Sequence, residues 1–168
     1  MIAIIDGVFS DIQMAQWKKN INRSTDNFVS GVLDKEGEGW HLIDADHDNQ
    51  YMCYEILRQA GKYFNTKNII GYDYWTHTGT RPLQWHYDKD ENAYLKFGIK
   101  RYPLCSTVFY LEVEELIGGK LHFGDGVEVV PKENRLIVFS EGLYHGVDDF
   151  EGVRTSININ PWNTRLYK

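Results

Sequence analysis

Three residues of this chain, the closely spaced pair His86 and Asp88 and the distant His145, are of types that could hold a metal ion. Two imidazoles and one carboxylate on one face of a divalent ion leave three octahedral positions open, an arrangement suited to Fe(II) chemistry with O2. On a helix His86 and Asp88 would point about 200° apart, whereas on a strand alternate residues share a face. We therefore predict a strand that projects both side chains into one cavity while Tyr87 points away.

An isolated His-x-Asp triplet is weak evidence of a metal site, but a patterned segment follows His145. After an expected turn at Glu151-Gly152, apolar and polar residues alternate strictly, as in a strand with two different faces. The apolar face would hold Val153, Thr155, Ile157 and Ile159, and the polar face Arg154, Ser156, Asn158 and Asn160. We interpret the polar face as lining the cavity. There the planar guanidinium of Arg154 could hold a carboxylate through two parallel hydrogen bonds, and the Ser156 hydroxyl could add a third.

On these residues the chain resembles the 2-oxoglutarate and Fe(II)-dependent dioxygenases, and within them the prolyl 4-hydroxylase-like group. The resemblance covers residues 68–163. The superfamily's pattern is His-x-Asp, a distant His and a basic residue beyond it, which here are His86, Asp88, His145 and Arg154. The segments 106–111, 118–123 and 129–139 resemble the family's successive barrel strands.

The resemblance implies a reaction and its cofactors. His86, Asp88 and His145 would bind Fe(II), while Arg154 and Ser156 would bind the cosubstrate 2-oxoglutarate. Together with O2 they would hydroxylate a C–H bond of a peptidyl residue or a small molecule and release succinate and CO2. A tyrosine near the metal often contacts the cosubstrate in this family. The further cosubstrate-binding candidates are therefore Tyr74, Tyr110 and Thr107.

Two departures from the family pattern bear on the substrate. Prolyl hydroxylases of this group usually carry lysine where this chain has Arg154, so substrate identity does not carry over. The nucleic-acid demethylase branch has a further arginine at the position of Asn160. The net charge of −6 would also repel a phosphate backbone, so we expect no nucleic-acid partner.

Two other functions fit part of the pattern. A jelly-roll binding module could keep the fold without turnover. A cupin-type metal enzyme could act without 2-oxoglutarate, and Arg154 would then be a structural ion-pair partner. Dependence on 2-oxoglutarate separates the dioxygenase from both.

The predicted fold is mostly β (α+β): a double-stranded β-helix, or jelly roll, with N-terminal helices packed outside. Short strands separated by Gly- and Asn-containing turns from residue 68 to 163 predict the barrel core. The helical part would cover residues 1–67. Ser10 is a plausible N-cap for a first helix with Ile12 and Ala15 on its apolar face. A second helix would run from Asn49 to Phe64, where apolar residues recur every four positions.

The 168 residues are enough for one domain with a sizeable core, and no apolar run is long enough to cross a bilayer. The start of the chain lacks the features of an export signal, so we expect a cytoplasmic protein with reduced cysteines at Cys53 and Cys105. The sequence carries no signal of an oligomeric state. Of the remaining histidines, we expect a surface or supporting position for His122, and His77 at the mouth of the site.

Overall fold

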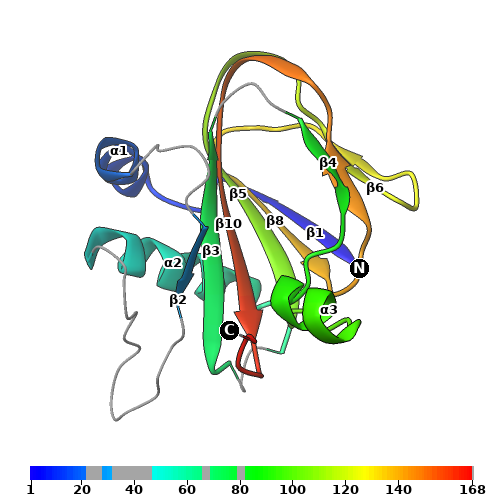
Figure 1. Cartoon of the computed structure of the whole chain (residues 1–168). Helices are drawn as coiled ribbons and strands as arrows, with labels where there is room; N and C mark the ends of the chain where they lie inside the picture. Colours follow the sequence, from blue (N-terminus) through cyan, green and yellow to red (C-terminus); the bar gives the residue numbers. More distant parts are fainter. Residues whose placement is uncertain (22–27, 32–46, 66–68, 79–81, 168) are drawn as a thin grey trace.

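The computed structural model describes residues 1–21, 28–31, 47–65, 69–78 and 82–167. Two antiparallel sheets face each other as a jelly roll, with two helices on the outer side of the larger sheet, as the sequence predicts (Figure 1). The residues 32–46, among them His41, lie outside the described residues.

The larger sheet has six strands in the order β1-β8-β5-β10-β3-β2. All neighbouring strands in it run antiparallel. Its strands are β1 (Ile2–Asp6), β2 (Phe28–Gly31), β3 (Gly71–Thr78), β5 (Cys105–Gly118), β8 (Arg135–Ser140) and β10 (Phe150–Trp162).

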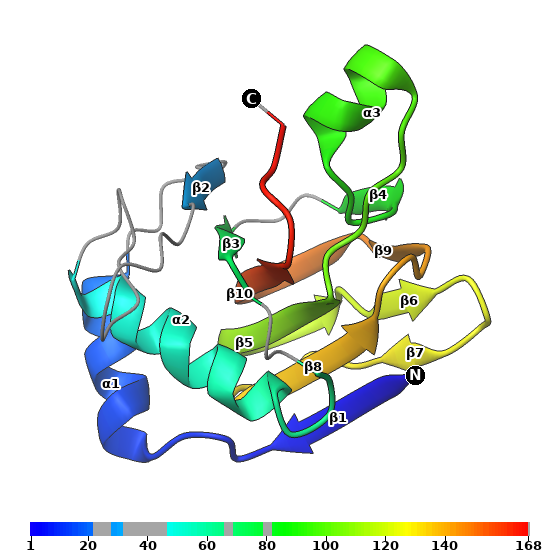
Figure 2. The ribbon, with the colours of Figure 1, turned by 90° about the horizontal axis from the view of Figure 1, so that it is seen from below.

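The smaller sheet has the order β4-β9-β6-β7 and closes the other side of the barrel (Figure 2). Its strands are short, with two to four residues each. They are β4 (Leu83–His86), β6 (Leu121–Phe123), β7 (Glu128–Val129) and β9 (His145–Val147).

Helices α1 (Asp11–Asn20) and α2 (His47–Ala60) cover the outer face of the larger sheet (Figure 2). Ser10 begins α1 with the predicted cap, since its hydroxyl accepts from the Gln13 N–H while the Gln13 side chain accepts from the Ser10 N–H. On α2 the predicted apolar stripe of Met52, Ile56 and Ala60 is buried.

Two apolar cores lie on the two faces of the larger sheet. Between this sheet and the helices, residues such as Trp17, Ile56 and Phe109 form the first core. The second core lies between the two sheets, and its buried residues are Val108, Tyr110, Leu121, Phe123, Val129, Ile137, Phe139 and Val147. Successive residues of β5 therefore point alternately to the helices and into the barrel.

The N-terminal part differs from the prediction in two ways. Residues 1–67 are not purely helical, because β1 forms the edge of the larger sheet beside β8. The buried face of α1 is also not the predicted one: Ile12 is 80% exposed, whereas Met14 and Trp17 are buried. The position of the sheet, which a local pattern does not contain, decides which face of this short helix is covered.

Near the barrel rim one local prediction is wrong and one helix was not predicted. The expected turn at Glu151-Gly152 is a β-bulge inside β10, where the pairing with β5 shifts its register. The segment after Asp88 contains a further helix, α3 (Glu91–Phe97). The side chain of Asp90 caps its first turn and Gly98 ends it in the left-handed conformation.

None of the helices in the described part of the chain is both long and apolar enough to cross a membrane.

Candidate metal and anion site

The side chains of His86, Asp88 and His145 meet at one end of the barrel. His86 ends β4 and His145 begins β9, and the antiparallel register places these two residues directly opposite each other. Asp88 lies just beyond the end of β4, so the prediction of one strand carrying both His86 and Asp88 holds only for His86. One ligand atom from each residue lies within 4.8 Å of the other two. This is close enough for all three to bind a single ion.

The backbone orients both imidazoles with Nε2 toward Asp88. His86 Nδ1 lies 2.7 Å from the Gln84 carbonyl oxygen, and His145 Nδ1 lies 2.9 Å from the Leu143 carbonyl oxygen. Because a carbonyl only accepts, Nδ1 carries the proton and Nε2 keeps its lone pair. The Nε2 atoms are 3.6 Å and 3.8 Å from the two carboxylate oxygens of Asp88. Histidine ligands of metals are commonly oriented in this way by a second hydrogen bond.

The three groups shift one another's pKa values. Burial lowers the pKa of His145, and the nearby charge of Asp88 only partly offsets this effect. Burial would also lower the pKa of His86, but the neighbouring Asp88 carboxylate, 3.6 Å from Nε2, outweighs burial and raises it. Burial would raise the pKa of Asp88, yet the two imidazoles and a hydrogen bond from Ser106 lower it. The carboxylate therefore stays ionised, and its negative charge would be compensated by a bound cation.

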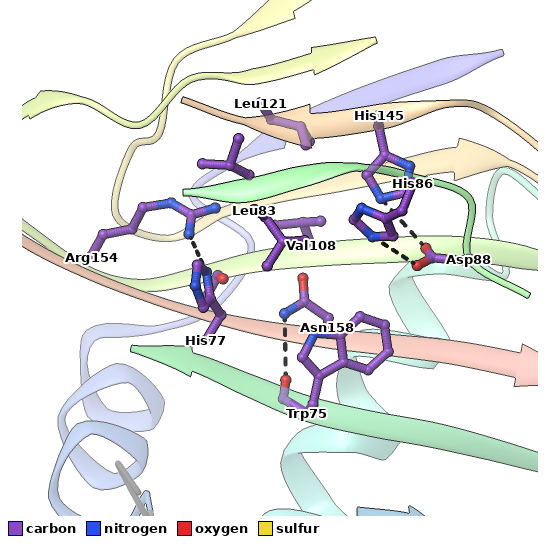
Figure 3. Close-up of a pocket in the computed structure, with 12 residues that line it drawn as sticks. Trp75, His77, Leu83, His86, Asp88, Val108, Leu121, His145, Arg154 and Asn158 are labelled. Atoms are coloured by element: carbon purple, nitrogen blue, oxygen red, sulfur yellow. Dashed lines mark hydrogen bonds and ion pairs between the residues drawn. The ribbon is translucent and has the colours of Figure 1, made fainter. Parts of the chain in front are cut away.

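A pocket with about 350 Å³ of space, including its open mouth, extends from these three residues along the inside of the barrel. Figure 3 shows the cluster of His86, Asp88 and His145 at one end and Arg154 with His77 at the other. Between the two ends the lining is mainly apolar and aromatic. It consists of Trp75, Leu83, Val108, Leu121 and Val147, with Ser156 and Asn158 on β10.

Arg154 is buried, with 2% of its surface exposed, and lines this pocket. The polar face of β10 thus points into the barrel and not to solvent. Among the described residues, no carboxylate lies within ion-pair distance of Arg154. Glu112 contacts Thr155, which lies on the other face of β10. A buried guanidinium without a compensating anion is costly, so this end of the pocket is suited to an anionic ligand.

Three polar atoms around the guanidinium are buried and have no hydrogen-bond partner in the described structure: Arg154 Nε, Ser156 Oγ and the Tyr110 hydroxyl. Tyr110 pairs with Ser156 across the sheet, and its ring lies 5.1 Å from the Arg154 guanidinium carbon. Burial raises the pKa of Tyr110, and Arg154 opposes this effect through its charge and through N–H groups that lie near the hydroxyl without meeting hydrogen-bond geometry. Since buried polar groups are nearly always paired, these three atoms indicate a ligand with acceptor oxygens.

Two of the predicted cosubstrate-binding residues, Tyr74 and Thr107, do not lie in the pocket. Tyr74 points away from the pocket and packs in the core beneath the helices. Thr107 also lies on that side of β5, and its hydroxyl donates to the Ile159 carbonyl and accepts from the Ile159 N–H. Alternation along the strands explains both positions, because odd residues of β5 from Cys105 to Leu111 and even residues of β3 face the helices.

The remaining histidines divide between the pocket and the surface. His122 lies outside the pocket, as predicted, and pairs with Asp148 at 2.5 Å and with Glu128 at 3.3 Å. His77 lines the pocket and contacts Arg154. No feature of the sequence predicts this contact. Alternation along β3 could have placed His77 and Trp75 on one face, but only the pairing with β10 brings His77 to Arg154.

No protein-family model and no curated protein matches the sequence. The structure, by contrast, is similar to several solved structures. An oxidoreductase of the 2OG-Fe(II) oxygenase family from Burkholderia pseudomallei has a TM-score of 0.67 at 17% identity, covering 97% of this chain and 84% of that one. A Pseudomonas putida prolyl-4-hydroxylase has a TM-score of 0.65 at 19% identity, covering 99% and 87%.

A third similar structure is HygX from Streptomyces hygroscopicus with nickel and 2-oxoglutarate bound. Its TM-score is 0.60 at 14% identity, and the match covers 99% of this chain and 84% of HygX. At these identities the likeness concerns the fold, which all three share over nearly the whole of this chain. The chain therefore has the fold of the 2-oxoglutarate and Fe(II)-dependent oxygenases.

Proposed function

We propose that this protein is a 2-oxoglutarate- and Fe(II)-dependent dioxygenase that hydroxylates a C–H bond of a peptidyl residue or a small molecule. The observation that carries the proposal is the buried Arg154, which has no carboxylate partner among the described residues and lies across the pocket from His86, Asp88 and His145. One end of the pocket thus offers ligands for a cation and the other a partner for an anion.

The donor set fits Fe(II). Two neutral imidazole nitrogens and one carboxylate oxygen could bind one face of the ion. The other coordination positions would then be open to ligands from the pocket. The hydrogen bonds to Gln84 and Leu143 hold both Nε2 atoms in place before an ion arrives. When bound, Fe(II) and 2-oxoglutarate supply the oxidative chemistry in which O2 hydroxylates the substrate while the cosubstrate becomes succinate and CO2.

The protein's own residues bind and orient. Arg154 would hold the far carboxylate of the cosubstrate by charge-assisted hydrogen bonds, and the free hydroxyls of Ser156 and Tyr110 would add hydrogen bonds to the same group. Leu83, Val108 and Leu121 line the space between the two ends and would exclude water. In such a dry site the attraction between Arg154 and a carboxylate is stronger than in water.

The class of substrate is the least constrained part of the proposal. A structurally similar protein is a prolyl-4-hydroxylase, which supports peptidyl residues as the first class to screen. Because Arg154 replaces the lysine usual in that group, small molecules form the second class. The free, buried thiols of Cys53 and Cys105 support a reducing, cytoplasmic environment, and the sheet shared by both cores supports one domain over residues 1–168.

The test is calorimetric titration of 2-oxoglutarate into the anaerobic Fe(II) protein and three variants. We expect the unsubstituted protein to bind 2-oxoglutarate with micromolar affinity. His145→Ala should abolish the binding of both iron and 2-oxoglutarate. Arg154→Ala should weaken cosubstrate binding and leave iron binding intact. His122→Ala, which removes a histidine outside the pocket, is the matched control and should change neither.

Other results would contradict the proposal in distinguishable ways. Iron binding without 2-oxoglutarate binding in the unsubstituted protein would point to a metal enzyme of the cupin type. Binding of neither would point to a module without turnover. Equal iron and cosubstrate affinities in the His145→Ala and Arg154→Ala variants would refute the assigned residues.

A further inference from the structure

We propose that His77 is a positioning residue that holds Arg154 in place without neutralising it, so that the guanidinium keeps its charge for a carboxylate ligand. This inference deepens the proposed function and rests on it. It assigns a role to a residue for which the sequence suggested only a place at the mouth of the site.

The contact between the two side chains determines the state of His77. Arg154 Nη1 lies 2.9 Å from His77 Nδ1, as the dashed line in Figure 3 marks. A guanidinium has only donors, so Nδ1 must accept the hydrogen bond. The ring is therefore neutral in this contact and carries its proton on Nε2. A protonated His77 would present an N–H to the guanidinium and repel it.

The sheet brings the two residues together. His77 on β3 is paired with Ser156 on β10, and Arg154 is the next residue on the same face of β10. Such diagonal neighbours are within reach of long side chains. The Phe150 ring packs near both, 5.5 Å from the guanidinium carbon and 6.4 Å from the His77 ring. Together with Tyr110, these groups restrict the guanidinium to one position.

The chemical type of the partner matters for the proposed ligand. An aspartate or glutamate at position 77 would form an ion pair with Arg154 and compete with the carboxylate of the ligand. An apolar residue would leave Nη1 without a partner and the side chain less ordered. A neutral acceptor binds one N–H, leaves the positive charge uncompensated, and leaves Nε free, as the structure has it. Histidine meets these conditions.

The experiment compares two substitutions of almost equal shape that differ in charge. His77→Asn places a neutral amide oxygen close to the position of Nδ1, whereas His77→Asp places a carboxylate there. By anaerobic calorimetry on the Fe(II) protein, we expect His77→Asn to bind 2-oxoglutarate within about threefold of the unsubstituted protein. His77→Asp should weaken binding about tenfold or more. His77→Leu, without an acceptor, should lie between them.

Two further readouts separate positioning from general damage. The 2-oxoacid 2-oxovalerate lacks the far carboxylate, so its affinity and that of Fe(II) should be the same in all variants. In the unsubstituted protein, ¹⁵N spectra of the imidazoles should show His77 as the neutral tautomer protonated on Nε2. Melting temperatures identify any variant that fails to fold. If His77→Asp fails to fold, the test becomes whether His77→Asn binds 2-oxoglutarate more tightly than His77→Leu.

The inference is overturned if His77→Asp binds 2-oxoglutarate as tightly as His77→Asn, or if the spectra show a proton on Nδ1 of His77. It is also overturned if 2-oxovalerate loses affinity in parallel with 2-oxoglutarate. Failure of the unsubstituted protein to bind 2-oxoglutarate is a different result, because it refutes the proposed function and this inference with it.

Discussion

At the scale of single residues, the site is defined by buried polar atoms that lack partners. A net hydrogen bond stabilises a protein by only about 1 kcal/mol, but an unsatisfied buried group costs about 1–3 kcal/mol. The Tyr110 hydroxyl, Ser156 Oγ and Arg154 Nε are all in this state; Arg154 and Ser156 line the pocket, and the Tyr110 ring lies 5.1 Å from the guanidinium carbon. Their cost to the folded protein would be recovered when a ligand binds, and this suggests a direct test.

Tyr110→Phe should have opposite effects on stability and on binding. Because the hydroxyl has no partner, its removal should leave the free energy of unfolding unchanged or slightly increased. Loss of the hydrogen bond to the ligand should weaken 2-oxoglutarate binding by about 0.5–1.5 kcal/mol, or roughly two- to tenfold. Urea denaturation without ligand and calorimetry with ligand measure the two effects.

The matched control is Tyr74→Phe, which removes the same atom from a tyrosine in the helix-side core. It should leave the affinity for 2-oxoglutarate unchanged. A loss of affinity in Tyr74→Phe, or none in Tyr110→Phe, would contradict the assignment of the Tyr110 hydroxyl to the ligand.

At the scale of secondary structure elements, irregularities in β5 and β10 decide which side chains enter the barrel. The register between these strands shifts twice, once at Gly152 and once between Thr155 and Ser156. On one side of the second shift, Tyr110 of β5 points into the barrel. On the other side, Glu112 of β5 contacts Thr155 on the face of the sheet that points away from the barrel. Regular alternation would instead have turned Glu112 toward Arg154. The irregularity therefore keeps a carboxylate away from the guanidinium.

Gly152→Ala should destabilise the protein more than Gly126→Ala. Both glycines have positive φ, +98° and +88°, which costs an alanine about 1–2 kcal/mol. A Cβ at Gly152 would also lie 2.4 Å from the Glu115 carbonyl oxygen, whereas one at Gly126 would meet no described atom within 4 Å. We expect a loss on the order of 3 kcal/mol for Gly152→Ala, measured by urea denaturation. Equal losses in the two variants would show that the bulge tolerates a side chain.

At the scale of the whole molecule, the larger sheet has one core on each face, so packing of the helices and closure of the barrel both depend on it. The larger sheet also contains a buried carboxyl group. Asp73 on β3 is 5% exposed and accepts a hydrogen bond from Trp162 Nε1 at 2.8 Å. Burial raises the pKa of Asp73 from 3.8 to about 7, although the Trp162 hydrogen bond opposes the shift.

This raised pKa predicts how stability depends on pH. The folded protein favours the protonated form of Asp73. The contribution of Asp73 to the free energy of unfolding is therefore fully present below the unfolded pKa of about 4, and it is lost as pH rises through about 7. Asp73→Asn cannot ionise and should gain stability relative to the unsubstituted protein between pH 5 and pH 8. The gain should be at most a few kcal/mol, about 1.4 kcal/mol for each unit of pKa shift. Urea denaturation across this range measures it.

Asp6→Asn is the control for this pH series. Hydrogen bonds from Arg135 and Lys132 lower the pKa of Asp6, so its contribution is present above the unfolded pKa and is lost only in strong acid. The free energy of unfolding of Asp6→Asn should therefore differ from that of the unsubstituted protein by the same amount at pH 5 and at pH 8. Parallel curves for Asp73→Asn as well would refute the raised pKa of Asp73.

The sequence alone determined the features that depend on local patterns. Ser10 identifies the start of α1, because a helix cap needs only neighbouring residues. Strict alternation from Val153 to Asn160 identifies β10, and the His-x-Asp triplet with His145 and Arg154 identifies the candidate site. Each of these signals is contained in the order of residues, so the fold class could be predicted and the candidate site residues could be proposed.

Only the tertiary structure decided which faces are covered and which strands are neighbours. The position of the sheet against α1 buries Met14 and leaves Ile12 exposed. Strand parity places Tyr110 beside Arg154 but Tyr74 and Thr107 beneath the helices. The pairing of β3 with β10 brings His77 to Arg154 across a gap of 77 residues. Such contacts depend on register and on strand order, which are properties of the assembled sheet and not of any one segment.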